Sequence, residues 1–245
     1  MGLFANIKQA QDVKQTEDRV GGSFKPLPSG VYKAVIKQMY AKPAQSGALG
    51  VTIEFEIHPQ QGDPRKFTET YYVTNKNGEN FYVNKNSGEK HYLAGFNHIN
   101  DICLGLTQKT MFELEAEGKI ELKNIKVYNY TTKKDEIEQL PTFVSLLDKE
   151  VGLGLIYKRE NKNTKVGNDY VPTAEVREYN AVDKVFLLKG GLPFTHNEVK
   201  AGLAEPQFVT QWLDKWKDQV DDQYKEVTGS TTSGTTQPAS ALNLG

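Results

Sequence analysis

Hydrophobic and polar residues alternate most regularly between Leu49 and His58, where every second side chain is apolar: Val51, Ile53, Phe55 and Ile57. Successive side chains of a β-strand point to opposite faces, so this alternation predicts a strand that is buried on one face only. Val31–Tyr40 and Arg65–Thr74 are also rich in β-forming residues. Because Pro43 and Gly47 separate the first two segments, we expect a hairpin there and an antiparallel sheet overall.

The spacing of apolar residues changes after this region. Apolar side chains now recur at three- and four-residue steps, which predicts an amphipathic helix over residues 93–106: Leu93, Phe96, Ile99, Cys103 and Leu106. Alternation returns at Ile120–Tyr130, and Val151–Glu160 and Tyr170–Tyr179 are predicted strands around a polar hairpin. Lys133–Glu138 is predicted to be a charged turn.

The chain divides into four segments by composition. Residues 1–29 form a predicted flexible arm, because glycine and proline interrupt any regular pattern there. Residues 30–204 form the β-rich domain, and residues 205–227 form a predicted amphipathic helix. Residues 228–245 carry no charge and consist mainly of Thr, Ser, Gly and Ala, which is typical of a disordered tail.

Composition restricts the classes of protein that need to be considered. The 245 residues include 30 basic and 31 acidic side chains, and the net charge of −1 argues against a polybasic nucleic-acid binder. Residues 205–227 alone carry −3, which leaves +2 on the rest of the chain. The single cysteine excludes an intramolecular disulfide and suits a reducing compartment. No apolar run approaches the roughly 20 residues that span a bilayer, so we expect a soluble, cytoplasmic protein with no membrane partner.

Motifs of common enzymes are missing from the sequence. It contains neither a phosphate-binding glycine loop nor a G-x-S-x-G nucleophile motif, and its four histidines form no H-E-x-x-H site. His91 and His98 are two helical turns apart and with Asp101 offer one possible metal site; the alternative is a solvated polar helix face. We therefore expect no enzymatic activity, no metal site and no cofactor.

The β-rich region interleaves aromatic and basic residues. Binding of single-stranded nucleic acid needs this combination, because cations neutralise phosphates while exposed rings stack on bases. The candidate stacking residues are Tyr71, Tyr72, Phe81, Tyr82, Tyr128, Tyr130 and Tyr157. The candidate phosphate contacts are Lys66, Lys123, Lys126, Lys158 and Arg159. The alternative is that each ring is a core or cross-strand partner and each lysine a solvated strand edge.

Several runs together resemble small phage-encoded proteins of replication modules. The runs are residues 30–36, 50–57, 65–67, the 93–106 helix and 146–153. This family includes single-stranded DNA-binding proteins with an OB fold, a five-stranded partly open barrel. The resemblance implies a mainly β, OB-like barrel with one internal helix and a C-terminal helix. It also implies coating of single-stranded DNA during replication, recombination or repair, with a possible weak homo-oligomer or cooperative array.

The C-terminus departs from the pattern of this family. Many members end in an acidic tail tipped by an aromatic residue, which recruits replication proteins, whereas residues 241–245 here contain neither. Recruitment of phage or host replication proteins would then fall to the 205–227 helix.

A second hypothesis is a structural or assembly protein of a phage particle. Its subunit contacts would come from the N-terminal arm, where Leu3, Phe4 and Ile7 form one short apolar turn.

Overall fold

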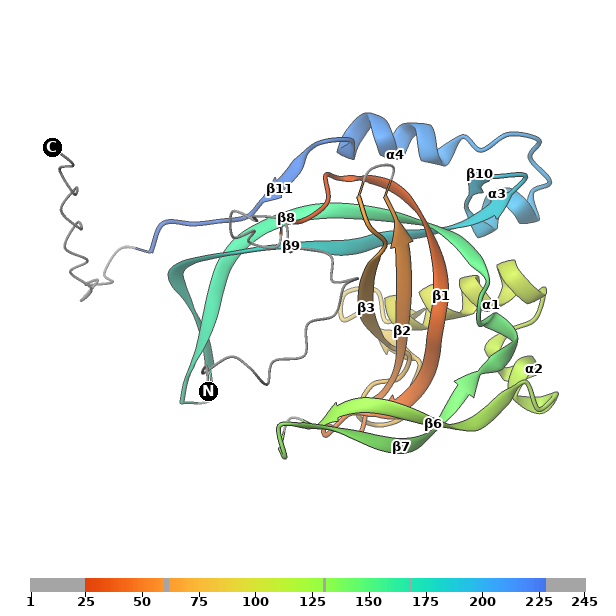
Figure 1. The fold of residues 1–245 in the computed structure, drawn as a ribbon. Coiled ribbons are helices and arrows are strands. Elements are labelled where there is room, and N and C mark those ends of the chain that lie inside the picture. Colours follow the sequence, from red (N-terminus) through yellow and green to blue (C-terminus); the bar gives the residue numbers. More distant parts are fainter. Residues whose placement is uncertain (1–24, 60–61, 130, 168, 228–245) are drawn as a thin grey trace, which may run out of the picture.

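The computed structural model describes residues 25–59, 62–129, 131–167 and 169–227, and its main feature is one large sheet (Figure 1). The long strands are β1 (Gly30–Pro43), β2 (Leu49–His58), β3 (Arg65–Tyr72), β8 (Glu150–Val166) and β9 (Asp169–Lys189). Their order in the sheet is β9-β8-β1-β2-β3, with the short β10 (Leu192–Phe194) beyond β9. The predicted mainly β, antiparallel architecture is confirmed, but the sheet is not closed into a barrel, because β3 and β10 lie at opposite ends of this order.

The shorter elements attach to this sheet. A hairpin of β6 (Ile120–Asn129) and β7 (Lys134–Phe143) joins β1, and β11 (Val220–Asp222) pairs with β8 in parallel. β4 (Phe81–Val83) and β5 (Lys90–Tyr92) form a separate two-stranded sheet. The helices are α1 (Ala94–Thr107), α2 (Met111–Ala116), α3 (His196–Lys200), α4 (Phe208–Trp216) and the 3-10 turn η1 (Val144–Leu146). No helix among the described residues is long and apolar enough to cross a membrane.

β2 shows the alternation that the sequence predicts. Its four apolar side chains are buried and belong to the main core, whereas the residues between them line the other face of the sheet. α1 covers the core face through Phe96, Ile99, Ile102 and Cys103. It approaches β3 so closely that a Cβ atom on Gly95 would lie 2.3 Å from the carbonyl oxygen of Tyr72.

Along one edge, strand β1 pairs with two different strands. Gly30–Val35 pairs with β8, whereas Tyr40 pairs with Thr142 of β7. The register with β2 shifts between Ile36 and Gln38, so a β-bulge lies where the partner changes. Such a bulge bends a strand and redirects its side chains. The β6–β7 hairpin is therefore held beside the second half of β1 (Figure 1).

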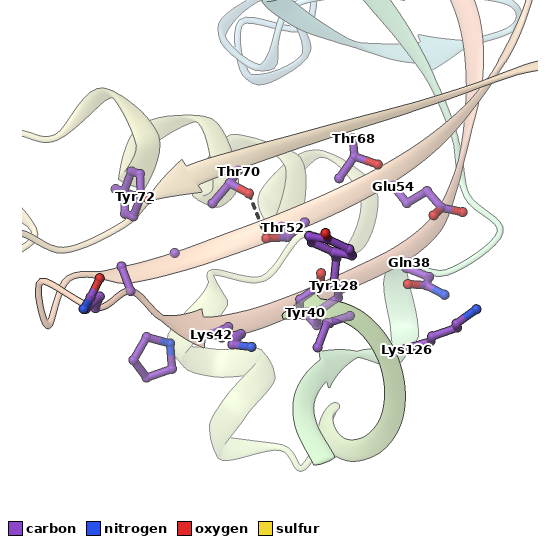
Figure 2. Close-up of a pocket in the computed structure, with 15 residues that line it drawn as sticks. Gln38, Tyr40, Lys42, Thr52, Glu54, Thr68, Thr70, Tyr72, Lys126 and Tyr128 are labelled. Carbon is purple, nitrogen blue, oxygen red and sulfur yellow. Dashed lines mark hydrogen bonds between the residues drawn. The ribbon is translucent and has the colours of Figure 1, made fainter. Parts of the chain in front are cut away.

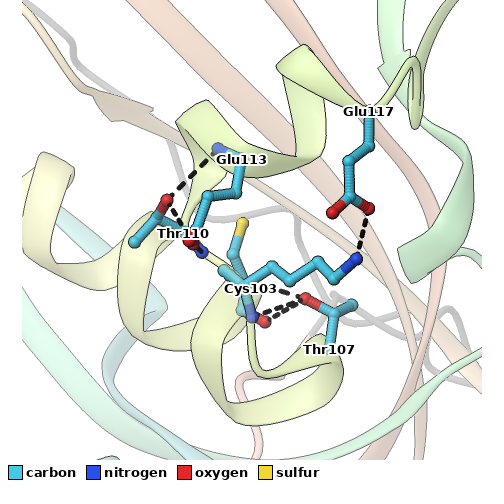
Figure 3. Close-up of polar contacts among 6 residues, drawn as sticks. Cys103, Thr107, Thr110, Glu113 and Glu117 are labelled. Atoms are coloured by element: carbon cyan, nitrogen blue, oxygen red, sulfur yellow. Dashed lines mark hydrogen bonds and ion pairs between the residues drawn. The ribbon is translucent and has the colours of Figure 1, made fainter.

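The connection from α1 to α2 is fixed by local hydrogen bonds (Figure 3). The Thr107 hydroxyl donates to the carbonyl of Cys103, and Thr110 and Glu113 form a capping box at the start of α2. An ion pair joins Lys109 to Glu117. Burial raises the pKa of the Cys103 thiol to about 12, so this cysteine is an unreactive core residue, as its place on the apolar helix face indicates.

Three predictions were wrong or incomplete. Lys133–Glu138 was predicted to be a turn, but from Lys134 onward these polar residues form the start of β7 and pair with β6. The sequence also predicted one helix over residues 205–227, but α4 ends at Trp216. Asp218 then adopts a left-handed backbone conformation (φ 59°), and the chain continues as β11. The predicted single internal helix is likewise incomplete, because α2 and α3 accompany α1.

A buried carboxylate joins α3 to α4. Glu198 caps α3 together with Thr195 and also accepts hydrogen bonds from the backbone N–H groups of Gln207 and Phe208, both at 2.7 Å. Burial alone would raise the pKa of Glu198, but the N–H donors outweigh it and hold the pKa below its ordinary value. The carboxylate thus stabilises the connection that positions α4.

Glu198→Gln is expected to lower the free energy of unfolding by about 1–3 kcal/mol at neutral pH, because the amide leaves buried N–H donors poorly paired. The pKa of Glu198 is lower in the folded protein than in the unfolded chain. Its stabilising contribution is therefore present above about pH 4.3 and is lost as the pH falls through the folded-state pKa. Thermal unfolding of wild type and variant should differ at neutral pH, and the difference should shrink as the pH falls below about 4.3.

The matched control is Glu113→Gln, which changes the same capping-box position on α2. Glu113 is exposed and its described hydrogen bonds are confined to Thr110, so we expect a smaller effect. Equal destabilisation by the two substitutions would contradict the proposed role of Glu198.

Candidate nucleic-acid interface

Three rows of side chains form part of the solvent-facing side of β1, β2 and β3. Strand pairing places Lys42, Gly50 and Tyr72 in one row, and Tyr40, Thr52 and Thr70 in the next. Gln38, Glu54 and Thr68 form the third row. The Thr52 and Thr70 hydroxyls are 2.9 Å apart and hydrogen-bonded. The resulting floor is polar but carries few charges.

The β6–β7 hairpin forms one wall of a groove over this floor (Figure 2). The groove has a volume of about 680 Å³, and Lys126, Val127 and Tyr128 line it from the hairpin side. Pro43, Ala44 and Gln45, which begin the β1–β2 connection, line it as well. We call this space the outer groove. Its lining extends along the sheet from Glu54 and Thr68 to Pro43 and Gln45.

Two half-exposed tyrosines face the outer groove. The exposed fractions are 51% for Tyr72 and 49% for Tyr128. Figure 2 shows Tyr72 toward one end of the groove and Tyr128 beside Tyr40 on the hairpin side. Gly50 leaves room for the Tyr72 ring, because a Cβ atom there would already lie 3.0 Å from Thr70 and 3.5 Å from that ring. The groove therefore offers flat aromatic surface at separate points along its length.

Tyr40 anchors the hairpin wall. Its ring packs on the small cluster of Ile125, Val127 and Leu140 that holds the hairpin against β1. Burial raises the pKa of Tyr40, which keeps its hydroxyl neutral at physiological pH. Tyr40 thus links the floor of the groove to its wall.

Each predicted phosphate contact is already in an ion pair. The pairs are Lys66–Glu54, Lys123–Glu121, Lys126–Asp135, Lys158–Asp221 and Arg159–Asp222, with N–O distances of 2.7–3.1 Å. Lys42 in the floor pairs with Glu138 at 2.6 Å. Such exposed pairs contribute only about 0–1 kcal/mol, so an incoming phosphate can replace the carboxylate. They also cancel the long-range field that would attract a polyanion.

The predicted stacking residues do not lie together. Tyr72 and Tyr128 reach the outer groove, whereas Phe81 and Tyr82 lie on the β4–β5 hairpin. Tyr157 lies on β8 next to Lys158 and Arg159, where β11 pairs. Tyr130 lies outside the described residues.

Tyr71 is corrected from a stacking residue to a core residue. It is 8% exposed and belongs to the main core, because it points to the opposite face of β3 from Tyr72. Its ring stacks on His98 with centroids 5.2 Å apart. Burial, assisted by the Glu69 carboxylate, strongly raises the pKa of Tyr71.

The hypothetical metal site on α1 is not assembled. His91 lies on β5 rather than on α1, where it approaches Glu89, whereas His98 packs on Tyr71. Within the described residues, no three His, Cys, Asp or Glu side chains are arranged to hold a metal ion.

Sequence reasoning named only Tyr72, Lys126 and Tyr128 among the groove residues and missed the others, including Tyr40, Lys42, Thr52 and Thr70. The polar positions of the alternating strands contained the signal for the threonines, because they lie between buried residues of β2 and β3. Tyr40 and Lys42 alternate in the same way at the end of β1. No comparable sequence pattern indicates that the β6–β7 hairpin lies beside this face, because its position depends on the contact between β1 and β7.

No protein-family model matches the chain, and no curated protein is significantly similar to it. The site is therefore interpreted from its own geometry.

Chemical nitration should separate the tyrosines of β3. We expect tetranitromethane at mildly alkaline pH to modify Tyr72 and Tyr128 but to spare Tyr71, because this reagent needs an accessible phenolate and Tyr71 is buried with a raised pKa. Peptide mass spectrometry measures the extent at each site. Modification of Tyr71 as fast as that of Tyr72 would contradict the assigned faces of β3.

Proposed function

We propose that this protein is a non-enzymatic, sequence-independent single-stranded DNA-binding protein that holds DNA in the outer groove. The observation that carries the proposal is the pair of half-exposed rings, Tyr72 and Tyr128, on an open sheet face walled by the β6–β7 hairpin. Rings of this kind stack on any base, because every base has a π-face.

The strand order supports an open variant of the OB fold. β8-β1-β2-β3 is the Greek-key arrangement, in which a fourth strand returns by a long connection to lie beside the first. β9 adds the fifth strand and α1 lies between the third and the fourth of these strands, although β9 and β3 are not paired with each other. OB folds bind oligonucleotides on the face of strands 2 and 3 and through the loop between strands 1 and 2. The outer groove occupies this face and is lined by Ala44 and Gln45 of that loop.

DNA binds by replacing the carboxylates that are paired with lysines on the protein surface. Bases stack on Tyr72 and Tyr128, while phosphates take the place of Glu138 on Lys42 and of Asp135 on Lys126. The released carboxylates remain near the DNA and repel it, so net attraction per lysine is smaller than for an unpaired cation. Stacking rather than charge then supplies most of the affinity.

The resemblance to phage replication proteins gives the proposal its context. Protection of single-stranded DNA during phage replication, recombination or repair takes place in the cytoplasm of the host. Recruitment of phage or host replication proteins would use α4, since Asp221 and Asp222 are already paired with Lys158 and Arg159.

The alternative function in particle assembly depends on the N-terminal arm. Leu3, Phe4 and Ile7 lie outside the described residues, as do residues 228–245 of the predicted tail. The outer groove favours DNA binding, and no described feature favours assembly over it.

Tyr72→Ala and Tyr128→Ala should each weaken binding of a fluorescent oligo-dT by about 1–3 kcal/mol, because each removes one stacking surface. Fluorescence anisotropy at low salt measures the dissociation constant. The control is Tyr71→Phe, which alters the neighbouring residue on the buried face and should leave binding unchanged. The proposal fails if the wild-type protein does not bind oligo-dT at low salt, or if both alanine variants bind as tightly as the wild type.

Glu138→Gln should increase affinity for oligo-dT at low salt, because it frees Lys42 for a phosphate. The slope of log affinity against log salt should become steeper by up to about 0.7, the value for one additional cation on single-stranded DNA. Glu150→Gln is the matched control, since it frees Lys33 from an equally short ion pair of 2.6 Å outside the outer groove. An equal gain from both substitutions would indicate a general charge effect and would contradict the assignment of Lys42.

A further inference from the structure

The small β4–β5 sheet presents different side chains on its two faces. Phe81 pairs directly with Tyr92 and Val83 with Lys90, and paired residues share a face. Tyr82 and His91 pair between them and therefore point to the other face, with ring centroids 5.7 Å apart. The hairpin thus offers two surfaces that can be tested separately.

The face that carries Tyr92 continues as a row of rings onto the helices. The Lys90 ammonium lies 4.6 Å from the Phe81 ring centroid, and Tyr92 lies 4.9 Å from Phe96 of α1. Phe96 in turn lies 6.0 Å from Phe112 of α2. Phe96 is buried, but Tyr92 and Phe112 are 58% and 56% exposed. We call Phe81, Lys90, Tyr92 and Phe112 the ring row.

Tight turns hold the hairpin in a defined shape. The Asn75 side-chain oxygen accepts hydrogen bonds from the backbone N–H groups of Asn77 and Glu79. The Asn84 side-chain oxygen accepts from Asn86 in the same way, and Leu93 donates to the carbonyl of Asn80. A ring held on such a scaffold loses little conformational entropy when a ligand stacks on it.

A shallow depression connects the hairpin to the outer groove. It has a volume of about 550 Å³ and shares Thr70 and Tyr72 with the groove. Its other lining residues include Asn75 and Leu93, which are at the two ends of the segment that carries β4 and β5. Tyr72 is therefore common to both spaces, and a chain leaving the groove past Tyr72 reaches the base of the hairpin.

The hairpin also differs from the groove in its charges. Lys76, Lys85 and Lys90 are exposed, and none of them is in an ion pair with the residues that the structure describes. The acids of the hairpin are engaged locally, since Glu79 accepts from the Asn75 amide and Glu89 lies 3.6 Å from His91. A phosphate that reaches this hairpin can therefore bind to lysines without first displacing a carboxylate from an ion pair.

We propose that the ring row is a second contact surface for single-stranded DNA, which the DNA reaches from the outer groove past Tyr72. This inference rests on the proposed function and deepens it, because it assigns the path of the bound polymer. Short oligonucleotides occupy the groove alone, whereas longer ones also stack on Tyr92 and Phe112 and place phosphates near Lys85 and Lys90.

The test compares oligo-dT of about 6 and about 20 nucleotides, lengths near the two limits of the roughly 4–16 nucleotides that an OB fold covers. Tyr92→Ala combined with Phe112→Ala should weaken binding of the long oligonucleotide at least about fivefold, the effect of losing one stacked base. Binding of the short oligonucleotide should not change. Lys90→Ala should reduce the salt dependence for the long oligonucleotide only.

Two controls separate stacking from a folding defect. Tyr92→Phe retains the ring and should bind both oligonucleotides as the wild type does. Tyr82→Ala removes an equally exposed ring from the opposite face of the hairpin and should have no effect at either length.

The two proposals fail in different ways. If the wild type binds neither oligonucleotide, the proposed function is wrong. If the wild type binds both and the double variant equals it at both lengths, the ring row is not a DNA contact, and the groove proposal stands. Equal weakening at both lengths, or the same loss from Tyr82→Ala, would also overturn the assigned path.

Discussion

The division of one edge of β1 between two partners is the constraint on which the candidate site depends. The first half of β1 pairs with β8, which completes the main sheet, and the second half meets β7. The change occurs at the bulge next to Ile36, where the backbone of Ile36 bonds to Asp148 and Lys149 and the Lys37 ammonium pairs with Asp148. If β8 continued along the whole edge, the β6–β7 hairpin would have no place beside the outer face. The floor would then be a flat, exposed sheet rather than a groove.

This arrangement separates the two faces of β1–β3 by function. The inner face holds Ile53, Phe55 and Met39 in the core and is covered by α1. The outer face leaves threonines and tyrosines in contact with solvent. A half-buried sheet of this kind can carry a binding surface without loss of stability, because its exposed residues are not those that form the core.

Electrostatics constrains the proposed binding of DNA, because the protein has almost no net charge. In the outer groove, lysines are matched with glutamate or aspartate on neighbouring strands. Long-range attraction for a polyanion is therefore small, and the proposed binding would depend on contact between rings and bases. The C-terminal segment shows the same matching on a larger scale, because its acidic residues Asp221 and Asp222 lie against the basic residues of β8. The basic body and acidic C-terminal segment seen in the sequence are thus two sides of one interface.

The hydrophobic periodicity of the sequence was sufficient to predict β2 and α1, because in these elements one face is buried and the pattern records it directly. The content of β-forming residues predicted β1 and β3. Alternation along β3 separates Thr70 and Tyr72 from Tyr71, which the structure buries although its residue type makes it a candidate stacking residue. The polar strand β7 was not predicted, because it is defined by pairing with β6 and not by alternation of apolar residues. The early end of α4 was not predicted either, because the left-handed conformation of Asp218 does not change the hydrophobic periodicity. Which of the interleaved rings and lysines meet in one groove depends on contacts between residues far apart in the chain, such as Tyr40 with Thr142 and Lys42 with Glu138. Local pattern carries no information about such contacts, because they arise from the packing of complete elements against one another.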